Sequence, residues 1–281
     1  MVKYKIGDAL KKGIALLNEN SIETAGLDAR ILLCKALGCD SVYLTVHRED
    51  EMPQQANDEY FSYIDRRSKR EPVGYIIGKK EFMSMDFVVT RDVLIPRPDT
   101  EILVERALDF LKDKRNPLII DMCTGSGAIA VSLAKYSPGA LVIGLDISKP
   151  ALAVARQNAR MNGVDITFDI HNVLVPYTSV IADCVVSNPP YIPTEVVEGL
   201  ESDVVDYEPC LALDGGSDGL DFYKAIVSNI SACLKKGGLL AFEVGMGQAE
   251  DVVSLMEPFF YNISVDKDLA GIERVVYGYL K

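Results

Sequence analysis

Apolar residues recur every three or four positions through the first seventy residues, a spacing that predicts amphipathic helices. Residues 6–17 place apolar side chains on one face and lysines on the other. Residues 27–37 repeat the pattern and stop at Gly38, a residue type that commonly ends helices. A third helix is predicted to begin at Pro53 and to end in the basic run 66–70. We expect this run to be solvated at the negative end of the helix dipole, with a contact to an RNA-bearing partner as the alternative.

The pattern changes after residue 71. Residues 81–89 alternate loosely between apolar and polar, and Gly74 and Gly78 precede them, which predicts a short β-hairpin. Residues 95–101 then open another helix. The predicted organisation is a helical domain (1–71), a hairpin linker (72–95) and a larger domain (96–281).

After Asn116, short apolar runs alternate with helical patterns. The predicted strands are 118–122, 141–145, 166–170, 182–187 and 239–244, and the predicted helices are 128–136, 150–162 and 222–234. This alternation favours a parallel sheet with helices on both faces, so the fold class is α/β. Residues 259–265 and 273–280 flank a short turn and are predicted to be two more strands that pair antiparallel.

The chain of 281 residues carries a net charge of −12. General electrostatic capture of a phosphate backbone is not expected of so acidic a protein, which weighs against DNA or RNA as the substrate. Six cysteines are scattered without pairing and two histidines form no ligand cluster, so we expect reduced thiols and no metal site. We find neither a signal-peptide core nor an apolar run of membrane-spanning length, and expect a cytoplasmic protein without membrane association.

A glycine-rich turn, Cys123–Gly127, sits where the first predicted strand gives way to a helix. Gly125 and Gly127 permit positive φ and close approach of a ligand, with Thr124 and Ser126 between the small residues. Residues 125–130 satisfy the pattern GxGxxA, and Asp146 ends the next strand, where a carboxylate can accept both hydroxyls of a ribose. An ordinary tight turn with a solvent-facing Asp is the alternative.

Two classes of nucleotide-like cofactor remain open, a nicotinamide dinucleotide and S-adenosylmethionine. Asp121 ends the first strand, two residues before the turn. A carboxylate there would repel a pyrophosphate and could help to hold an ammonium group, which favours S-adenosylmethionine. Capping of the loop is the alternative role for Asp121.

The segment Asn188–Tyr191, of sequence Asn-Pro-Pro-Tyr, follows the fourth strand at the same edge of the sheet. The Asn188 side-chain oxygen and the Pro189 carbonyl can accept both hydrogens of a planar NH2 group. Pro189 and Pro190 stiffen the turn, and Tyr191 offers a flat face for stacking. This arrangement predicts transfer of a group to an amide or amino nitrogen, mainly by positioning for in-line displacement. A rigid loop after a strand is the alternative.

Asn-Pro-Pro-Tyr after the fourth strand is typical of amino-methylating class I methyltransferases, and further motifs extend the resemblance. They are Ile95–Glu101, Asn188–Ile192, Tyr207–Pro209 with Ala212–Gly216, Asp218–Leu220, and Asp268–Gly271 with Arg274. With these motifs the chain resembles the PrmC/HemK family over nearly its whole length. Phe82 and Arg97 lie in family-typical segments, with core packing as the alternative for Phe82.

The resemblance implies a Rossmann-like domain with a seven-stranded, mostly parallel sheet and a small helical domain that docks the substrate. It implies transfer of a methyl group from S-adenosylmethionine, leaving S-adenosylhomocysteine, to the side-chain amide nitrogen of the glutamine in the Gly-Gly-Gln motif of class 1 peptide chain release factors. We expect a monomer that acts on this protein partner and not on nucleic acid. The family's cofactor contacts fall on Cys123–Gly127, Asp146, Asn172, Val173 and Asn188, and its glutamine contacts on Asn188–Tyr191.

Two departures from the family pattern concern the cofactor. Cys123 stands where glycine is common, and Asn172-Val173 stands where Asp and an aromatic residue are common. Asn172 can still meet the adenine amino group through its carbonyl oxygen, whereas Val173 offers less stacking area. Two other functions remain as alternatives: a nucleic-acid amino-methyltransferase, for which no basic surface is visible, and a binding module with a relic fold.

Overall fold

The computed structural model describes residues 4–281, and two compact units make up the chain. The first unit comprises the chain up to Gly78 together with Ser202–Tyr207. The second comprises Lys79–Glu201 and Glu208–Lys281. The chain therefore leaves the second unit for six residues in the middle of its sequence.

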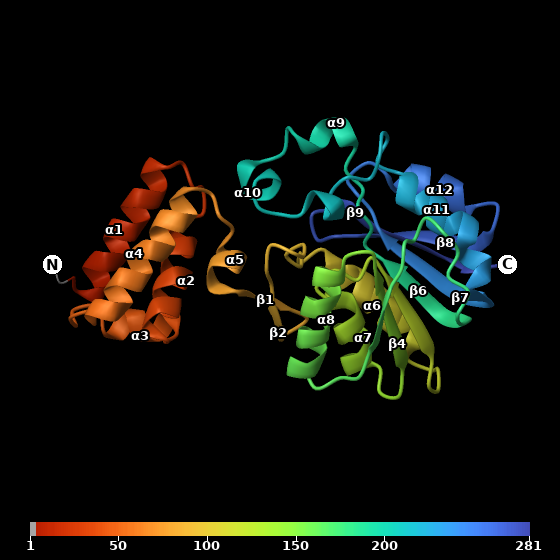
Figure 1. Cartoon of the computed structure of the whole chain (residues 1–281), viewed down its shortest axis with the longest axis horizontal. Helices are drawn as coiled ribbons and strands as arrows, with labels where there is room; N and C mark the ends of the chain where they lie inside the picture. Colours follow the sequence, from red (N-terminus) through yellow and green to blue (C-terminus); the bar gives the residue numbers. More distant parts are fainter. Residues whose placement is uncertain (1–3) are drawn as a thin grey trace. The chain divides into compact units, whose positions relative to one another are not determined.

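The first unit is helical (Figure 1). Its helices are α1 (Ile6–Glu19), α2 (Ala25–Leu37), α3 (Ser41–Val46), α4 (Gln54–Ser68), α5 (Val73–Ile77) and α10 (Ser202–Val205). Helices α1, α2 and α4 pack against one another, and the Tyr60 side chain is fully buried among them. Gly13 permits this packing, because a Cβ there would lie 1.9 Å from the Tyr60 hydroxyl. The predicted end of α2 at Gly38 is confirmed, since this residue has φ 64°.

The prediction that the whole basic run 66–70 is solvated was wrong. The Arg67 side chain is buried and its guanidinium pairs with Asp28, at 2.8 Å, and with Asp203. Arg66 pairs with Glu71 at 2.7 Å. Because a buried guanidinium needs compensating charge, the carboxylates of Asp28 and Asp203 hold Arg67 at the end of α4.

The second unit begins with a hairpin of β1 (Lys79–Phe82) and β2 (Met85–Val88). The hairpin itself is confirmed, within the segment that the sequence predicts as a linker. Phe82 is 1% exposed and packs edge-on against the buried Phe87, so the core-packing alternative holds for this residue. The fully buried Asn158 side chain accepts from Val88 N at 2.7 Å and donates to Val88 O at 3.0 Å. It also donates to Ser126 O at 2.9 Å, so one amide joins the hairpin to the glycine-rich turn.

Seven strands form the main sheet in the order β5-β4-β3-β6-β7-β9-β8. Their bounds are β3 (Leu118–Met122), β4 (Leu141–Asp146), β5 (Thr167–Ile170), β6 (Ala182–Ser187), β7 (Leu234–Glu243), β8 (Phe260–Lys267) and β9 (Glu273–Leu280). Only β9 runs against its neighbours, so the predicted mostly parallel sheet and the antiparallel last pair are confirmed. The structure differs at residues 230–234, where the predicted helix has already ended and β7 begins at Leu234 to pair with Ala182.

Helices cover both faces of this sheet (Figure 1). They are α6 (Thr100–Leu111), α7 (Ala128–Tyr136) and α8 (Lys149–Met161) on one face, and α11 (Asp221–Asn229) and α12 (Ala249–Met256) on the other. The short α9 (Thr194–Val197) and the 3-10 turns Cys210–Ala212 and Ile230–Ala232 lie in connections. Successive residues of a strand serve opposite faces: Ile119 packs under the first set of helices and Ile120 under the second.

The parallel register brings the ends of three strands to one edge of the sheet. Asp121 near the end of β3 lies opposite Gly144 of β4 and Val186 of β6. The loops that follow β3, β4 and β6 therefore leave the sheet side by side, which is where ligands bind in open α/β sheets. Among residues 4–281, no helix is both long and apolar enough to cross a membrane.

Candidate active site

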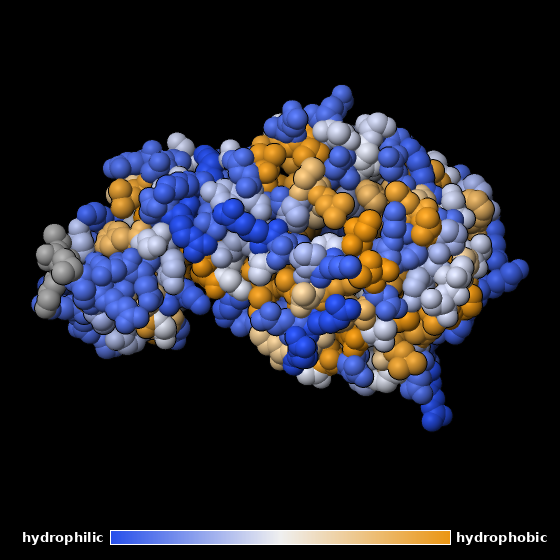
Figure 2. All heavy atoms as spheres, viewed as in Figure 1, coloured by the Kyte–Doolittle hydropathy of each residue, from blue (hydrophilic) through white to orange (hydrophobic). Residues whose placement is uncertain are grey.

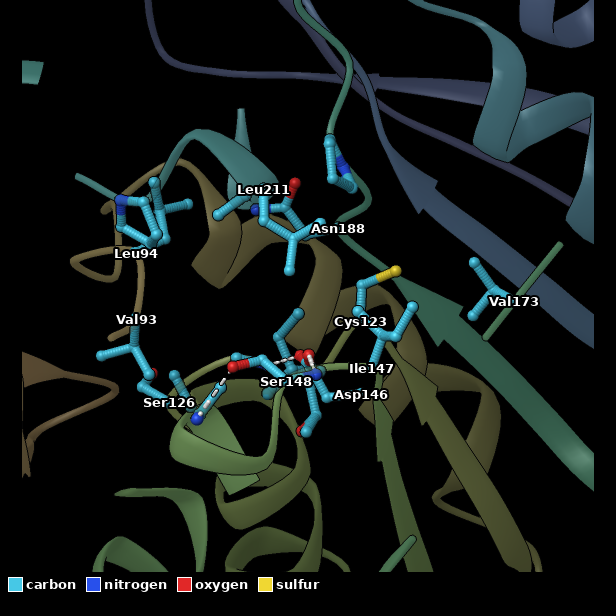
Figure 3. Close-up of a pocket in the computed structure, with 18 of the residues that line it drawn as sticks. Val93, Leu94, Cys123, Ser126, Asp146, Ile147, Ser148, Val173, Asn188 and Leu211 are labelled. Carbon is cyan, nitrogen blue, oxygen red and sulfur yellow. Dashed lines mark hydrogen bonds between the residues drawn. The ribbon is translucent and has the colours of Figure 1, made fainter. Parts of the chain in front are cut away.

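A cavity of about 260 Å³ opens in the second unit at this edge of the sheet (Figure 3). It gathers most of the residues predicted for the site, which come from four different loops. Those that line it are Cys123, Thr124, Gly125, Ser126, Asp146, Asn172, Val173, Asn188 and Pro190. Figure 3 draws Cys123 between Asn188 on one side and Asp146 on the other.

Hydrophobic residues are also exposed on the face of the second unit seen in Figure 2.

The turn after β3 has the left-handed backbone that its small residues predict. Cys123, Gly125 and Gly127 have φ of 61°, 54° and 79°. A Cβ on Gly127 would also lie 3.0 Å from the Ala155 Cβ, so α8 leaves no room for a side chain there. The φ of Cys123 gives a physical reason why glycine suits that position, since any Cβ is strained in this region.

Asp146 holds the turn from the neighbouring strand. Its Oδ2 accepts a hydrogen bond from Gly125 N at 2.8 Å, and its Oδ1 accepts one from Ser148 N at 2.9 Å. Burial raises the pKa of this carboxyl, and the two N–H donors oppose that rise. Asp146 is partly exposed into the cavity, and each carboxylate oxygen can accept a further hydrogen bond from a ligand hydroxyl.

Asp121 lies behind the turn and is fully buried, outside the cavity lining. Its Oδ2 accepts from the Thr124 hydroxyl at 2.6 Å and from Ala130 N at 3.1 Å. The structure thus favours the loop-capping role over a direct contact with a ligand. Its Oδ1 has no hydrogen-bond partner within the described part of the chain.

The segment Asn188–Tyr191 is divided between the cavity and the protein interior. Asn188 and Pro190 line the cavity, and Asn188 Nδ2 lies 3.4 Å from Thr100 Oγ1 at the start of α6. Pro189 is buried and outside the lining. The Tyr191 ring packs on the α11–α12 side of the sheet, near Gly245, and burial raises the pKa of its hydroxyl to about 12. The predicted stacking face of Tyr191 is therefore not part of this cavity.

Comparison with known proteins gives two family models and a set of relatives. The model described as PrmC N-terminal domain matches residues 8–78, and the one described as Methyltransferase small domain matches residues 99–204. A release factor glutamine methyltransferase from Clostridium acetobutylicum is 42% identical over 277 residues, 97% of each chain. A relative of the same name from Geobacter sulfurreducens is 44% identical, covering 93% of this chain and 92% of its own.

The chain belongs to the release factor glutamine methyltransferase family. It is an enzyme of the methyltransferase class, as its sequence predicts, and its family implies S-adenosylmethionine as the methyl donor.

Solved structures show the same fold in this methyltransferase and in distant proteins. The hMettl16 catalytic domain has a TM-score of 0.57 at 14% identity, covering 77% of this chain and 82% of its own. A methyltransferase from Pyrococcus furiosus has a TM-score of 0.52 at 14% identity, covering 71% of this chain and 91% of its own. At this level of identity the similarity concerns the fold alone. It confirms the α/β methyltransferase fold that the sequence predicts.

Several residues that line the methyltransferase's cavity were not predicted from the sequence. Ile147 follows Asp146 and is 50% exposed, and Leu211 is 56% exposed. A large apolar side chain in a loop after a strand is a signal that could have indicated Ile147. Val93, Leu94 and Phe222 also line the cavity, and the fold brings them there from segments far from the glycine-rich turn in sequence.

Arg97, whose role the sequence does not define, connects two segments that line the cavity. Its Nη2 lies 2.8 Å from both carboxylate oxygens of Glu208. Burial raises the pKa of Glu208 and the Arg97 charge opposes that rise. The pair joins the segment before α6 to the segment around Pro209, and both segments line the cavity.

We expect the buried carboxyl of Asp121 to make the stability of this methyltransferase fall as pH rises. Burial raises its pKa from 3.8 to about 7. Between these values the folded state binds more protons than the unfolded state, so stability decreases with pH and levels off above the folded pKa. One such group contributes at most about 1.4 kcal/mol per pH unit.

Urea unfolding at a series of pH values, for the natural chain and for Asp121→Asn, measures this contribution. The amide does not titrate, so the variant should show a shallower fall in unfolding midpoint. Equal slopes for the two proteins would show that Asp121 is ionised throughout the range.

Proposed function

We propose that this chain methylates the N5 nitrogen of the glutamine in the Gly-Gly-Gln motif of class 1 peptide chain release factors. The observation that carries the proposal is one cavity lined both by Asp146 with the glycine-rich turn and by Asn188. A donor bound to the turn would lie beside a side chain suited to hold an amide. The name shared by close relatives supports the acceptor.

The cavity fits S-adenosylmethionine in the chemistry of its walls. The Asp146 carboxylate is open on the cavity side and suits the two ribose hydroxyls. Gly125 leaves the space beside the turn free, because nothing lies within 4 Å of a Cβ built there. Exposed Ile147 and buried Val173 offer apolar contacts to a flat base, and Asn172 is exposed and available for its amino group. When bound, the donor supplies an electrophilic methyl group on a sulfonium.

The residues of the acceptor loop would act by positioning. An amide nitrogen is a weak nucleophile because its lone pair is delocalised. Asn188 Oδ1 and the Pro189 carbonyl would accept the two N–H hydrogens and direct the nitrogen at the methyl carbon. The amide nitrogen would form its new bond to the methyl carbon as that carbon's bond to the donor breaks, and it would lose one proton to water. The donor would leave as S-adenosylhomocysteine with the bonding electron pair.

We further propose that the helical first unit docks the release factor and that the enzyme acts as a monomer in the cytoplasm, where its acceptor works. The net charge of −12 supports a protein acceptor over a nucleic acid. A nucleic-acid amino-methyltransferase would need a basic surface to hold a phosphate backbone.

Incubation with S-adenosylmethionine labelled in the methyl group tests the proposal. We expect label in a purified class 1 release factor and none in a release factor whose Gly-Gly-Gln glutamine is replaced by alanine. DNA and ribosomal RNA serve as competing acceptors in separate arms. Label in nucleic acid alone would overturn the proposed acceptor. Absence of cofactor binding by calorimetry would favour a binding module with a relic fold.

A further inference from the structure

A buried carboxyl group lies directly behind Asn188. Glu243 ends β7, and the β6–β7 register pairs Ser187 with Phe242, so the next residues along the two strands are Asn188 and Glu243. Glu243 is 4% exposed and does not line the cavity. A carboxyl group so deeply placed costs free energy unless its interactions compensate, and the proposed function does not yet use it.

The side chains of two cavity-lining residues, Thr100 and Asn188, lie close enough to the Glu243 carboxyl to oppose the rise in its pKa that burial causes. Asn188 Nδ2 in turn lies 3.4 Å from Thr100 Oγ1. An ionised carboxylate can only accept hydrogen bonds. It therefore favours the rotamer in which the Asn188 NH2 group faces the protein interior. The opposite rotamer would place Oδ1 against a negative charge.

We propose that Glu243 is a positioning residue for methyl transfer, which fixes the Asn188 side-chain amide so that Oδ1 faces the cavity. This inference rests on the proposed function, in which Asn188 Oδ1 accepts a hydrogen from the glutamine amide. With the amide reversed, Asn188 would present two donors to a group that needs an acceptor. Glu243 itself touches neither the cofactor nor the acceptor, because Thr100 and Asn188 lie between it and the cavity.

The groups around Glu243 set its ionisation. The Asp99 carboxylate raises the pKa of Glu243 and the Arg274 guanidinium, which pairs with Asp99 at 2.9 Å, lowers it. Burial raises the pKa of Tyr191 and Tyr223, and the Glu243 charge in turn raises both further. The Tyr223 hydroxyl donates to the main-chain carbonyl of Glu243 at 2.9 Å and leaves the carboxyl free. Oε2 has no partner within residues 4–281. Burial raises the pKa of Glu243 to about 7, above its usual 4.5.

The state of this carboxyl has a consequence for the rate. The protonated acid can donate to Asn188 Oδ1 and stabilise the reversed amide, whereas the ionised form cannot. The active form is the deprotonated one, so kcat should be full above the pKa of Glu243 and fall as pH drops through it.

Glu243→Gln tests the inference, because glutamine keeps the shape and loses the charge and can donate as well as accept. We expect kcat to fall about 10- to 100-fold, the cost of a mispositioned reacting group. We expect KM for the release factor and the Kd for S-adenosylmethionine to stay near those of the natural enzyme. The fall in kcat at low pH that we ascribe to protonation of Glu243 (the acidic limb of the pH profile) should be absent in this variant.

Asp183→Asn is the matched control, because it makes the same carboxylate-to-amide change on β6 away from the cavity. Asp183 accepts from Leu118 N at 2.9 Å and pairs with Lys235 at 2.8 Å. We expect its kcat and pH profile to match those of the natural enzyme even if its unfolding temperature drops.

An unchanged kcat in Glu243→Gln, or an acidic limb with the same midpoint, would overturn the positioning role while the natural enzyme still methylates its acceptor. Inactivity of the natural enzyme would instead refute the proposed function. If Glu243→Gln does not fold, Glu243→Asp decides: a lower kcat with the acidic limb retained supports the role, and full kcat overturns it.

Discussion

Asn188→Ala is expected to lower kcat for release factor methylation by at least about 10³-fold, because the variant removes the side-chain acceptor that aligns the amide nitrogen. Asn188 lines the cavity on the acceptor side and lies beside Thr100 and the buried Glu243. Alanine would also remove a polar side chain that lies beside the buried Glu243 carboxyl. The loss should therefore exceed that of Glu243→Gln, which only disorders the same amide.

Single-turnover transfer of a labelled methyl group, with cofactor and release factor in excess of their Kd values, measures this effect on the chemical step. Asn162→Ala is a suitable control, because Asn162 donates to the Asp86 and Asn158 carbonyls and lies outside the cavity lining. Its single-turnover rate should equal that of the natural enzyme. A rate for Asn188→Ala close to that of the control would contradict the positioning mechanism.

Asp146→Ala is expected to weaken binding of S-adenosylmethionine by about 100-fold or more. Loss of a carboxylate that accepts from two ribose hydroxyls removes two charge-assisted hydrogen bonds, each worth about 1.5–3 kcal/mol. The variant also releases Gly125 N and Ser148 N, so the turn loses its link to β4. Both effects reduce affinity for the cofactor, and neither acts on the acceptor loop.

Isothermal titration with S-adenosylmethionine or S-adenosylhomocysteine measures the Kd of the natural chain and that of Asp146→Ala. Asp169→Ala provides the comparison, since this exposed carboxylate on the adjacent strand β5 is outside the cavity and accepts from the Tyr177 hydroxyl. We expect it to bind the cofactor as the natural chain does. Equal affinities for the Asp146 and Asp169 variants would show that the ribose is held elsewhere.

Elements whose pattern is local were predicted well from the sequence. The helix over residues 128–136 has the predicted bounds, as do the strands over 118–122 and 182–187. The spacing of apolar residues differs strongly between strands and helices. The strands of a buried parallel sheet are short, continuous apolar runs in the sequence, separated by helices. The short helices α3 and α5 were missed, because fewer than two turns give no periodic signal.

The site was predicted in part. Residues that follow a strand directly, such as Asp146 and Asn188, line the cavity because parallel strands end at one edge. The direction in which each side chain of a loop points was not predictable. Asp121 faces inward to Thr124 and Tyr191 packs toward Gly245, although their neighbours in sequence line the cavity.

The sequence by itself determined the α/β fold, the edge of the sheet where the site lies, and the residue types that indicate methyl transfer to an amide. These follow from periodicity, from glycine at positive φ and from motifs of a few adjacent residues. Three features were decided by the tertiary structure alone. The buried Glu243 lies beside Asn188, Arg97 forms an ion pair with Glu208, and the buried Arg67 forms one with Asp203. Such contacts join residues far apart in the chain, and only the packed core sets their distance.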